Sequence, residues 1–367
     1  MKITFIKSDL ADAITKVMKA VSSKASIPAL EGILLSAKDK KLTLTGYDLE
    51  IGIKAVINEV IIQEEGGIVF PAHLLSDLVK KSKDVKITLE SDEKFVAKIT
   101  SGKSKFKIVG LSPDDYPDLP NVTEKETFSL PGETLKRLIS QTNYAVSDNN
   151  AKPIYTGSLF EIENRELTVC AIDGFQMAIS KETIDSGINT SFVLPGKTEK
   201  TLSSIVSDKD KINVSVDNRF ISFAVDNVIV YSRLIEGTFL DYKSTLPSET
   251  NTKVTIKSEE LLYALERFNL IENDKVKSPV RLTVKDDLIN LKVKTALASA
   301  DDEVVAEVEG ENVEIGFNIS YLINGLKAID SDEVVLSLKG ALSPMTITPT
   351  EGDSQLALVV PMRLADK

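Results

Sequence analysis

The stretch Ser258–Phe268, SEELLYALERF, carries the helix signal from which the rest of the chain is interpreted. Ser258 is a typical N-cap residue, and the two glutamates after it suit the positive end of a helix dipole. Apolar residues follow at positions 261, 262, 265 and 268, which form one stripe of a helix. The preceding Val254-Thr255-Ile256 alternates like a short strand. The sequence therefore predicts a strand that leads into an amphipathic helix.

The same strand-then-helix pattern occurs twice upstream, from Ile3 and from Phe128. Leu10, Leu135 and Leu261 align without gaps, at steps of 125 (135 − 10) and 126 (261 − 135) residues. Other landmarks recur in the same order and at nearly the same period: Leu42-Thr43-Leu44, Leu167-Thr168-Val169 and Leu291-Lys292-Val293, then Val69-Phe70-Pro71, Val193-Leu194-Pro195 and Gly316-Phe317-Asn318. This pattern predicts a threefold duplication, and because the period is domain-sized, three similar domains.

The predicted domains span residues 1–122, 123–248 and 249–367, and we call them the first, second and third repeat. Each follows one plan, a strand, a helix and three strands, twice over, which indicates an α+β fold with antiparallel sheets. The six predicted helices span 8–24, 72–83, 132–145, 196–206, 258–268 and 319–329. Sheets that extend from repeat to repeat would satisfy strand edges, and such a head-to-tail arrangement closes into a ring if the rotation suits.

Composition is that of an ordinary globular chain, with 42% hydrophobic and 27% charged residues. The N-terminus reaches polar residues at once, and no apolar run approaches the roughly 18 residues of a membrane span. The single cysteine, Cys170, excludes an internal disulfide and suits a reducing cytoplasm. We therefore expect a cytoplasmic protein without a structural zinc site, and the sequence indicates no cofactor.

Charge is unevenly distributed along the chain, whose net charge is −11. The six predicted helices carry a summed charge of +4, so all other segments together carry −15. If the helices share one surface, that surface is mildly basic on an acidic body. The alternative is that lysines simply populate exposed helix faces.

Residues for catalysis are scarce. His73 is the only histidine, so no Ser/His/Asp triad is available, and a lone histidine is usually a surface or cap residue. No phosphate-binding loop of the form GxxxxGK[ST] occurs. Asp301-Asp302-Glu303 could bind a cation, although a solvated acidic loop explains it as well. An enzyme that uses only carboxylates such as Asp48 and Asp173 stays an alternative, but their equivalent repeat positions favour a turn-capping role.

Several motifs resemble the β subunit of bacterial DNA polymerase III, the sliding clamp family. They are Leu44-Thr45-Gly46 with Asp48-Leu49-Glu50, Gly102–Phe106, Cys170–Phe175, Glu314–Tyr321 and the terminal Val359-Val360-Pro361-Met362-Arg363-Leu364. The resemblance covers all three repeats. It implies a homodimeric ring that encircles double-stranded DNA without sequence preference, has no catalysis of its own, and tethers the replicative polymerase and other DNA enzymes. It also implies a clamp loader as partner and a location at the nucleoid.

The resemblance further implies which residues face DNA: Lys24, His73, Asn149, Lys152 and Lys197. Many weak phosphate contacts from such residues hold a duplex and still permit sliding. Pro153-Ile154 replaces an aromatic pair found in some members. For each lysine, the alternative is an ordinary solvated side chain.

Members of this family bind short partner peptides in an apolar groove between the second and third repeats. By motif, the groove residues here are Tyr155, Gly157, Ile172, Gly174, Phe175, Gln176, Met177, Leu240, Asn318, Tyr321, Pro344, Leu358, Val360 and Met362. Such a groove suits a peptide with one glutamine and several apolar anchors. Phe175-Gln176-Met177 departs from the His-Arg-Leu of many members, and some of these apolar residues must belong to the core because strand residues alternate faces.

The predicted ring seam pairs the first repeat's Gly102–Val109 strand with residues 268–275 of the third repeat in a second chain. Its apolar candidates are Phe106, Ile108, Leu270 and Ile271, and the lysines at 103, 105 and 107 would meet Glu272 and Asp274. The remaining alternative function is a clamp-like peptide-binding scaffold that does not encircle DNA.

Overall fold

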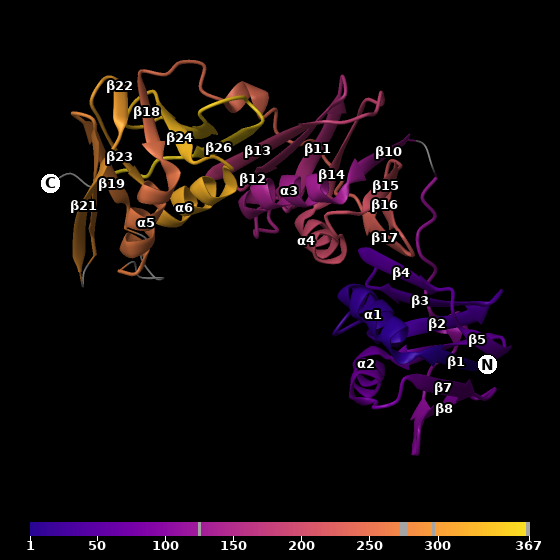
Figure 1. Ribbon diagram of the computed structural model, residues 1–367. Coiled ribbons are helices and arrows are strands. Elements are labelled where there is room, and N and C mark those ends of the chain that lie inside the picture. Colours follow the sequence, from indigo (N-terminus) through magenta and orange to yellow (C-terminus); the bar gives the residue numbers. More distant parts are fainter. Residues whose placement is uncertain (124–125, 272–277, 296–297, 365–367) are drawn as a thin grey trace. The chain divides into compact units, whose positions relative to one another are not determined.

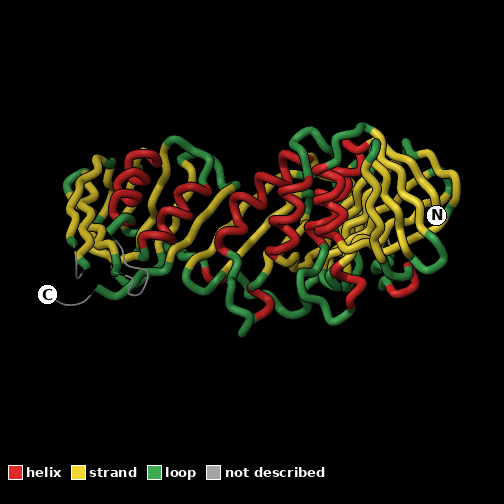
Figure 2. Tube along the Cα trace, turned by 90° about the horizontal axis from the view of Figure 1, so that it is seen from below, coloured by secondary structure: helices red, strands yellow, loops and turns green. Residues whose placement is uncertain are grey.

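The computed structural model describes residues 1–123, 126–271, 278–295 and 298–364. Within these residues, six α-helices and short 3₁₀ turns accompany four sheets whose paired strands are all antiparallel (Figures 1 and 2). The α+β class predicted from the sequence is therefore confirmed.

The helices occur where the periodicity predicts them. They are α1 (Lys7–Val17), α2 (Ala72–Lys81), α3 (Gly132–Thr142), α4 (Gly196–Ile205), α5 (Ser258–Asn269) and α6 (Ile319–Ala328). The predicted end of α1 at residue 24 is wrong, since a 3₁₀ turn, Met18–Ala20, ends the helical segment. No residue between Ala20 and Ala29 is buried, so no apolar face holds a further turn against the sheet.

The strands follow the predicted plan with two additions. In the first repeat they are β1 (Lys2–Ile6), β2 (Gly32–Lys38), β3 (Lys41–Tyr47), β4 (Ile51–Ile57), β5 (Ile61–Glu64), β6 (Gly66–Pro71), β7 (Lys86–Ser91), β8 (Val96–Ser101) and β9 (Ser104–Val109). In the second they are β10 (Glu126–Pro131), β11 (Gly157–Glu163), β12 (Glu166–Ile172), β13 (Gln176–Thr183), β14 (Thr190–Pro195), β15 (Lys211–Val216), β16 (Phe220–Val225) and β17 (Val228–Arg233). In the third they are β18 (Thr252–Lys257), β19 (Val280–Lys285), β20 (Leu288–Lys294), β21 (Ser299–Val305), β22 (Glu307–Gly310), β23 (Val313–Phe317), β24 (Glu333–Leu338), β25 (Met345–Pro349) and β26 (Gln355–Val359).

The second repeat matches the predicted order, whereas β5 and β22 are extra strands in the other two. The prediction of a turn at residues 64–67 is therefore wrong in part, because β5 ends at Glu64 and β6 begins at Gly66. Both extra strands are four residues long without a buried residue, and each pairs with the first strand of its own repeat, β5 with β1 and β22 with β18. Such short, solvent-facing segments give no clear alternation of buried and exposed positions, so the sequence pattern does not reveal them.

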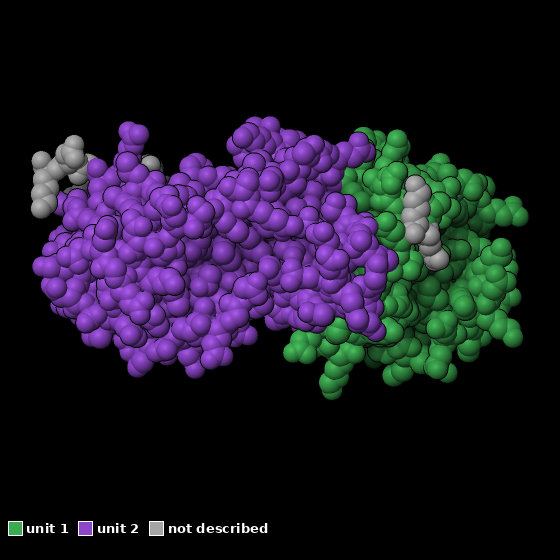
Figure 3. Space-filling view, turned by 90° about the horizontal axis from the view of Figure 1, so that it is seen from above, with its two compact units in different colours: residues 1–133, 201–234 green, residues 134–200, 235–367 purple. Residues whose placement is uncertain are grey.

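Chain contacts divide the structure into two compact units, which Figure 3 colours separately. Unit 1 comprises residues 1–133 and 201–234, and unit 2 comprises residues 134–200 and 235–367. Unit 1 contains the sheets β5-β1-β7-β8-β9 and β10-β15-β16-β17-β4-β3-β2-β6. Unit 2 contains the sheets β14-β11-β12-β13-β26-β25-β24-β18-β22 and β21-β20-β19-β23. The predicted domain boundaries at 122 and 248 stay predictions.

Each long sheet joins strands of two neighbouring repeats, as the edge argument predicts. In unit 1, β4 of the first repeat pairs with β17 of the second. In unit 2, β13 of the second repeat pairs with β26 of the third. We call these pairings the first and second junction. Each junction satisfies the backbone donors and acceptors of two strands that would otherwise end their sheets.

The apolar stripe of α5 packs into the core of the third repeat. Leu261, Leu265 and Phe268 are buried against the strands of that repeat, together with Ala264. The predicted cap is wrong, because Lys257 and not Ser258 precedes the helix, and no side chain caps it. Since β18 continues directly into α5, the Ser258 N–H instead donates to the carbonyl of Asp332 at 2.8 Å.

Candidate partner-binding surface

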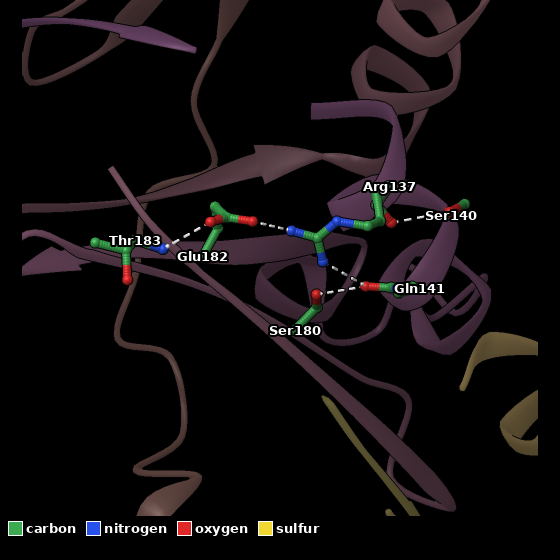
Figure 4. Close-up of polar contacts among 6 residues, drawn as sticks. All are labelled: Arg137, Ser140, Gln141, Ser180, Glu182 and Thr183. Atoms are coloured by element: carbon green, nitrogen blue, oxygen red, sulfur yellow. Dashed lines mark hydrogen bonds and ion pairs between the residues drawn. The ribbon is translucent and has the colours of Figure 1, made fainter. Parts of the chain in front are cut away.

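The two faces of β13 are chemically different, and this alternation defines the site. On one face, Ser180 Oγ donates to Gln141 Oε1 of α3 at 2.7 Å, and Arg137 of α3 forms an ion pair with Glu182 (Figure 4). Met177, Ile179 and Lys181 alternate with these residues and so lie on the opposite face, away from α3. We call that opposite face of β11, β12, β13 and β26 the helix-free face.

Cross-strand pairs on the helix-free face form successive rows. Met177 pairs with both Ile172 and Leu358 in the first row. Ile179 pairs with Cys170 and Leu356 in the second. These side chains form one cluster, against which Val360 packs and which includes Tyr242 from the linker that follows β17. Of the residues predicted to line the groove, the structure therefore brings Ile172, Met177, Leu358 and Val360 together.

Aromatic rings accompany this cluster. Phe175 stacks on Tyr321 of α6 with 6.2 Å between ring centroids, and the Phe175 side chain is 60% exposed. Tyr155 meets Phe239 edge to face at 5.6 Å. Leu240 is 41% exposed. Exposed apolar side chains beside a buried apolar cluster form the kind of surface that anchors a partner peptide.

The turn before β13 presents Phe175. Gly174 has φ +96°, a conformation that favours glycine, and the carboxylate of Asp173 accepts hydrogen bonds from the N–H groups of Phe175 and Gln176 at 2.7 and 2.9 Å. Asp48 makes the equivalent turn before β4, where it accepts from Glu50 and Ile51. The predicted turn-capping role of Asp48 and Asp173 is therefore confirmed.

Gln176 is the predicted groove residue that the structure turns away from the helix-free face. Its side chain is buried, and its amide donates to the Tyr144 carbonyl at 3.4 Å and to Asp173 at 2.9 Å. It shares the face of Ala178, which packs with Ala145 and Tyr144. Period-two alternation predicts this position, because Met177 next to it faces the other way.

Three of the remaining predicted groove residues, Met362, Asn318 and Pro344, lie in or near the segments that adjoin the C-terminal residues, and the fourth, Gly157, lies on β11. Met362 bridges to Gly316 through a 2.8 Å backbone hydrogen bond, and Asn318 caps α6 through its side-chain oxygen, which accepts from Ser320 N–H at 2.9 Å. Pro344 directly precedes β25. Gly157 begins β11, where an added Cβ would lie 2.2 Å from the Leu194 carbonyl oxygen, so the position requires glycine.

The predicted DNA-facing residues are all exposed. Lys24 and His73 belong to unit 1, and Asn149, Lys152 and Lys197 belong to unit 2. Asn149 Oδ1 accepts the N–H of Ala151, and the Lys152 ammonium lies 5.9 Å from the centroid of the Tyr155 ring. Their exposure is compatible with phosphate contacts, and their role stays a prediction.

The predicted seam residues differ in exposure. Phe106 on β9 is 40% exposed and Leu270 is 83% exposed, whereas Ile108 is buried and Ile271 packs against the core of its own repeat. The predicted acidic partners Glu272 and Asp274 lie outside the described residues.

Two findings bear on chemistry in the described part of the chain. No group of three or more His, Cys, Asp or Glu side chains there could hold a metal ion, and Asp301 and Asp302 form ion pairs with Lys292 and Arg267. Burial raises the pKa of the Cys170 thiol, which has no exposed surface.

No helix within the described residues is both long and apolar enough to cross a membrane.

Sequence reasoning missed a buried carboxyl group in the second repeat. Glu199 of α4 has no exposed surface, and its oxygens accept from Asn143 Nδ2 at 2.8 Å and from Ser158 N–H at 3.2 Å. Burial raises its pKa to about 7. Repeat alignment supplies the missing signal, because the steps of 124 and 123 place Leu75 and Leu322 at the equivalent positions.

The fold and the joined sheets define a DNA-clamp architecture, and comparison with known proteins identifies its family. Models of the N-terminal, central and C-terminal domains of the DNA polymerase III beta subunit match residues 1–120, 129–241 and 243–363. The chain belongs to the DNA polymerase III beta subunit family.

Relatives cover essentially the whole chain. The beta sliding clamps of Staphylococcus epidermidis and Staphylococcus aureus are each 33% identical over 99% of both chains. The crystal structure of a DNA polymerase sliding clamp from Bacillus subtilis matches at TM-score 0.97 and 31% identity, and covers 100% of both chains. That of a putative DNA polymerase III beta subunit from Eubacterium rectale matches at TM-score 0.96 and 32% identity over 99% of both.

Proposed function

We propose that this protein is a DNA sliding clamp, a ring of two chains that encircles duplex DNA and confers processivity on the replicative polymerase. The observation that carries this proposal is the match over the whole chain to sliding clamps in both sequence and fold. The alternative, a scaffold that does not encircle DNA, has no observation in its favour.

Ring closure has a physical basis in two sheet edges. In the described part of the chain, β9 ends one sheet of unit 1 and β21 ends one sheet of unit 2. β9 carries Lys105 and Lys107, whereas β21 carries Asp301, Asp302 and Glu303. Pairing of these edges across two chains would continue the sheets and bring unlike charges together. This refines the predicted seam, with Phe106 and Leu270 as its most exposed apolar members.

The clamp needs no catalytic residues of its own. Topological linkage keeps the ring on DNA, and weak contacts between exposed lysines and phosphates centre the duplex without fixing its sequence. Lys24, Lys152 and Lys197 are exposed candidates for these contacts, along with His73 and Asn149. The polymerase, the clamp loader and other DNA enzymes would bind the helix-free face at the second junction through short apolar peptides. Such a protein acts in the cytoplasm at the nucleoid.

The test is retention on DNA of defined topology. Purified clamp is loaded with a clamp loader and ATP onto nicked circular DNA and separated from free protein by gel filtration. We expect the clamp to stay with the circle and to be lost once a restriction enzyme linearises it. Equal retention on circular and linear DNA would contradict encirclement and favour the scaffold.

A further inference from the structure

A second pocket continues the helix-free face beyond the predicted groove residues. It is a cavity of about 550 Å³ in unit 2. Its apolar floor is formed by Ile179, Leu246 and Leu356, which belong to or pack against the same cluster as Met177 and Leu358. The pocket and the groove residues thus share one apolar layer. Tyr242, which also lines the pocket, is part of that layer.

The rows of the sheet explain why the pocket lies there. Beyond the apolar rows, Lys181 pairs with Thr168, and Thr168 pairs with Glu161. The last row brings Glu163 opposite Glu166 across β11 and β12. Rows are two residues apart, or roughly 6.6 Å along a strand, so the row of Glu163 and Glu166, three rows beyond that of Met177, lies roughly 20 Å from it. About six extended residues of a bound peptide span that distance.

The pocket walls are acidic. Its lining contains four carboxylates, Glu161, Glu163, Glu166 and Asp353, but only two lysines, so its formal charge is −2. Both lysines are engaged within the pocket: Lys243 lies 2.8 Å from Glu161, and Lys181 lies 3.1 Å from Asp353 and 3.7 Å from Glu166.

Glu163 faces Glu166 directly across β11 and β12, and Glu166 shares the Lys181 ammonium with Asp353, so the negative charge of the two glutamates is only partly neutralised. Like charges that face each other directly across two strands destabilise a sheet, and a cation placed between them relieves the repulsion. A wall of this kind discriminates against an acidic partner and favours a basic one.

The lining is held in place before any partner arrives. The Tyr242 hydroxyl donates to Glu161 at 3.1 Å, and Lys243 lies over the Tyr242 ring, 5.6 Å from its centroid. These contacts attach the 3₁₀ turn Lys243–Thr245 to β11. Thr245 N–H also donates to the Tyr242 carbonyl at 3.1 Å.

We propose that this pocket, which we call the flank pocket, binds the segment that directly flanks a partner's groove-binding peptide, and that it selects lysine or arginine there. This rests on the proposed function, because it assumes that a peptide occupies the Met177 and Leu358 end of the helix-free face. Two observations support it: the apolar layer is continuous, and the pocket's charge is complementary to a basic segment. The groove gives the main affinity, and the flank pocket ranks competing partners.

The test compares synthetic peptides on the full-length protein. A labelled parent peptide carries one glutamine and three leucine or phenylalanine anchors, and its derivatives add Lys-Lys or Glu-Glu at either end. Fluorescence anisotropy at low salt gives each Kd. At the end that reaches the flank pocket, we expect the lysine extension to bind about three- to tenfold tighter than the glutamate extension. The ratio of the Kd of the glutamate extension to that of the lysine extension should shrink as salt is added.

Two matched double variants locate the effect. Glu163 and Glu166 are exposed, so Glu163→Gln/Glu166→Gln leaves the core intact and should reduce the ratio to about one. Glu307→Gln/Glu309→Gln changes charge equally on β22, the far edge strand of the same sheet, and should leave the ratio unchanged.

The proposal is overturned if lysine and glutamate extensions bind alike at both ends, or if the ratio survives in Glu163→Gln/Glu166→Gln. Binding of the parent peptide distinguishes a failure of the flank pocket from a failure of the proposed peptide surface. A parent that binds while its extensions make no difference refutes the flank pocket alone. A parent that does not bind at all refutes the proposed peptide surface and the flank pocket with it.

Discussion

The two junctions have the same architecture but present different surfaces. Each joins a strand that follows an Asp-capped turn to the last strand of the next repeat, β4 to β17 and β13 to β26. At the second junction, Met177 pairs with Leu358 and Ile179 pairs with Leu356 on the helix-free face. That face is therefore apolar along two rows.

At the first junction, the equivalent rows are interrupted. With the repeat offset of 125, Gly52 and Lys54 take the places of Met177 and Ile179, and they pair with Tyr231 and Ile229. Leu119 lies over Gly52, where an added Cβ would come 2.4 Å from Leu119 Cδ2. Duplication thus reproduced the strand pairing at both junctions, while side-chain differences gave the second a continuous apolar surface and interrupted that of the first.

Removing the exposed anchors at the second junction should have the largest effect. Phe175→Ala/Leu240→Ala deletes two exposed apolar side chains, each worth about 1–2 kcal/mol to a bound peptide. We expect the Kd of the parent peptide to rise about 100-fold in fluorescence anisotropy, with unchanged circular dichroism.

The matched control removes apolar groups at the first junction. Leu49→Ala/Tyr231→Ala alters the positions equivalent to Gly174 and Leu358, and should leave the peptide Kd within twofold. A similar loss in both double variants would show that the two junctions do not differ as described.

The buried carboxyl group of Glu199 distinguishes the second repeat from the other two, which have Leu75 and Leu322 at the equivalent positions. Burial raises the pKa of Glu199 from its ordinary value of 4.5 to about 7, against the opposing effect of the hydrogen bonds from Asn143 and Ser158 and of the Lys200 charge. The native state therefore holds this proton more tightly than the unfolded chain. Its stabilising contribution is fully present below about pH 4.5 and is lost as pH rises through about 7.

Glu199→Gln imitates the protonated form and should remove this pH dependence. Since one pKa unit corresponds to about 1.4 kcal/mol, the wild-type protein should lose about 3 kcal/mol of unfolding free energy by pH 8.5 that the variant keeps. Thermal unfolding from pH 5 to 8.5 measures this. Parallel pH curves for the two proteins would show that Glu199 does not titrate as its burial requires, and Glu307→Gln, at an exposed site, serves as the control.

Filling the first junction should have the smallest effect. Gly52→Ala forces the tip of the Leu119 side chain aside, which should cost about 1 kcal/mol of stability. Gly187→Ala, where an added Cβ meets nothing within 4 Å, is the matched control and should stay within about 0.5 kcal/mol of wild type. In a chemical denaturation cycle, Leu119→Ala should relieve the cost of Gly52→Ala. If the stability costs of Gly52→Ala and Leu119→Ala simply add, the Leu119 side chain does not contact a Cβ at position 52.

The fold could be predicted from the sequence because the repeats support one another. The stripe Leu10, Ala13, Ile14 and Val17 is weak evidence alone, but the same spacing recurs at Leu135 and Leu261, and all of these side chains are buried. Where a feature is not repeated or not apolar, prediction failed. The strands β5 and β22 are four residues long without a buried residue, and at the start of α5 the Ser258 N–H donates to the carbonyl of the distant Asp332 while no side chain caps the helix.

The candidate site was predictable only in outline. Motif resemblance and strand alternation identify Ile172, Met177 and Leu358, which cluster in the structure. Alternation also contains the information that Gln176 faces away, although the motif alone placed it in the groove. The flank pocket depends on Tyr242 and Leu246, which a linker brings onto the sheet, and no local pattern predicts that long-range contact.

A negative-stain electron micrograph of the purified full-length protein shows whether two chains close into a ring. We expect closed rings of two chains, with six similar domains around a hole wide enough for a DNA duplex. Compact or open-ended particles at concentrations where light scattering reports a dimer would contradict this arrangement.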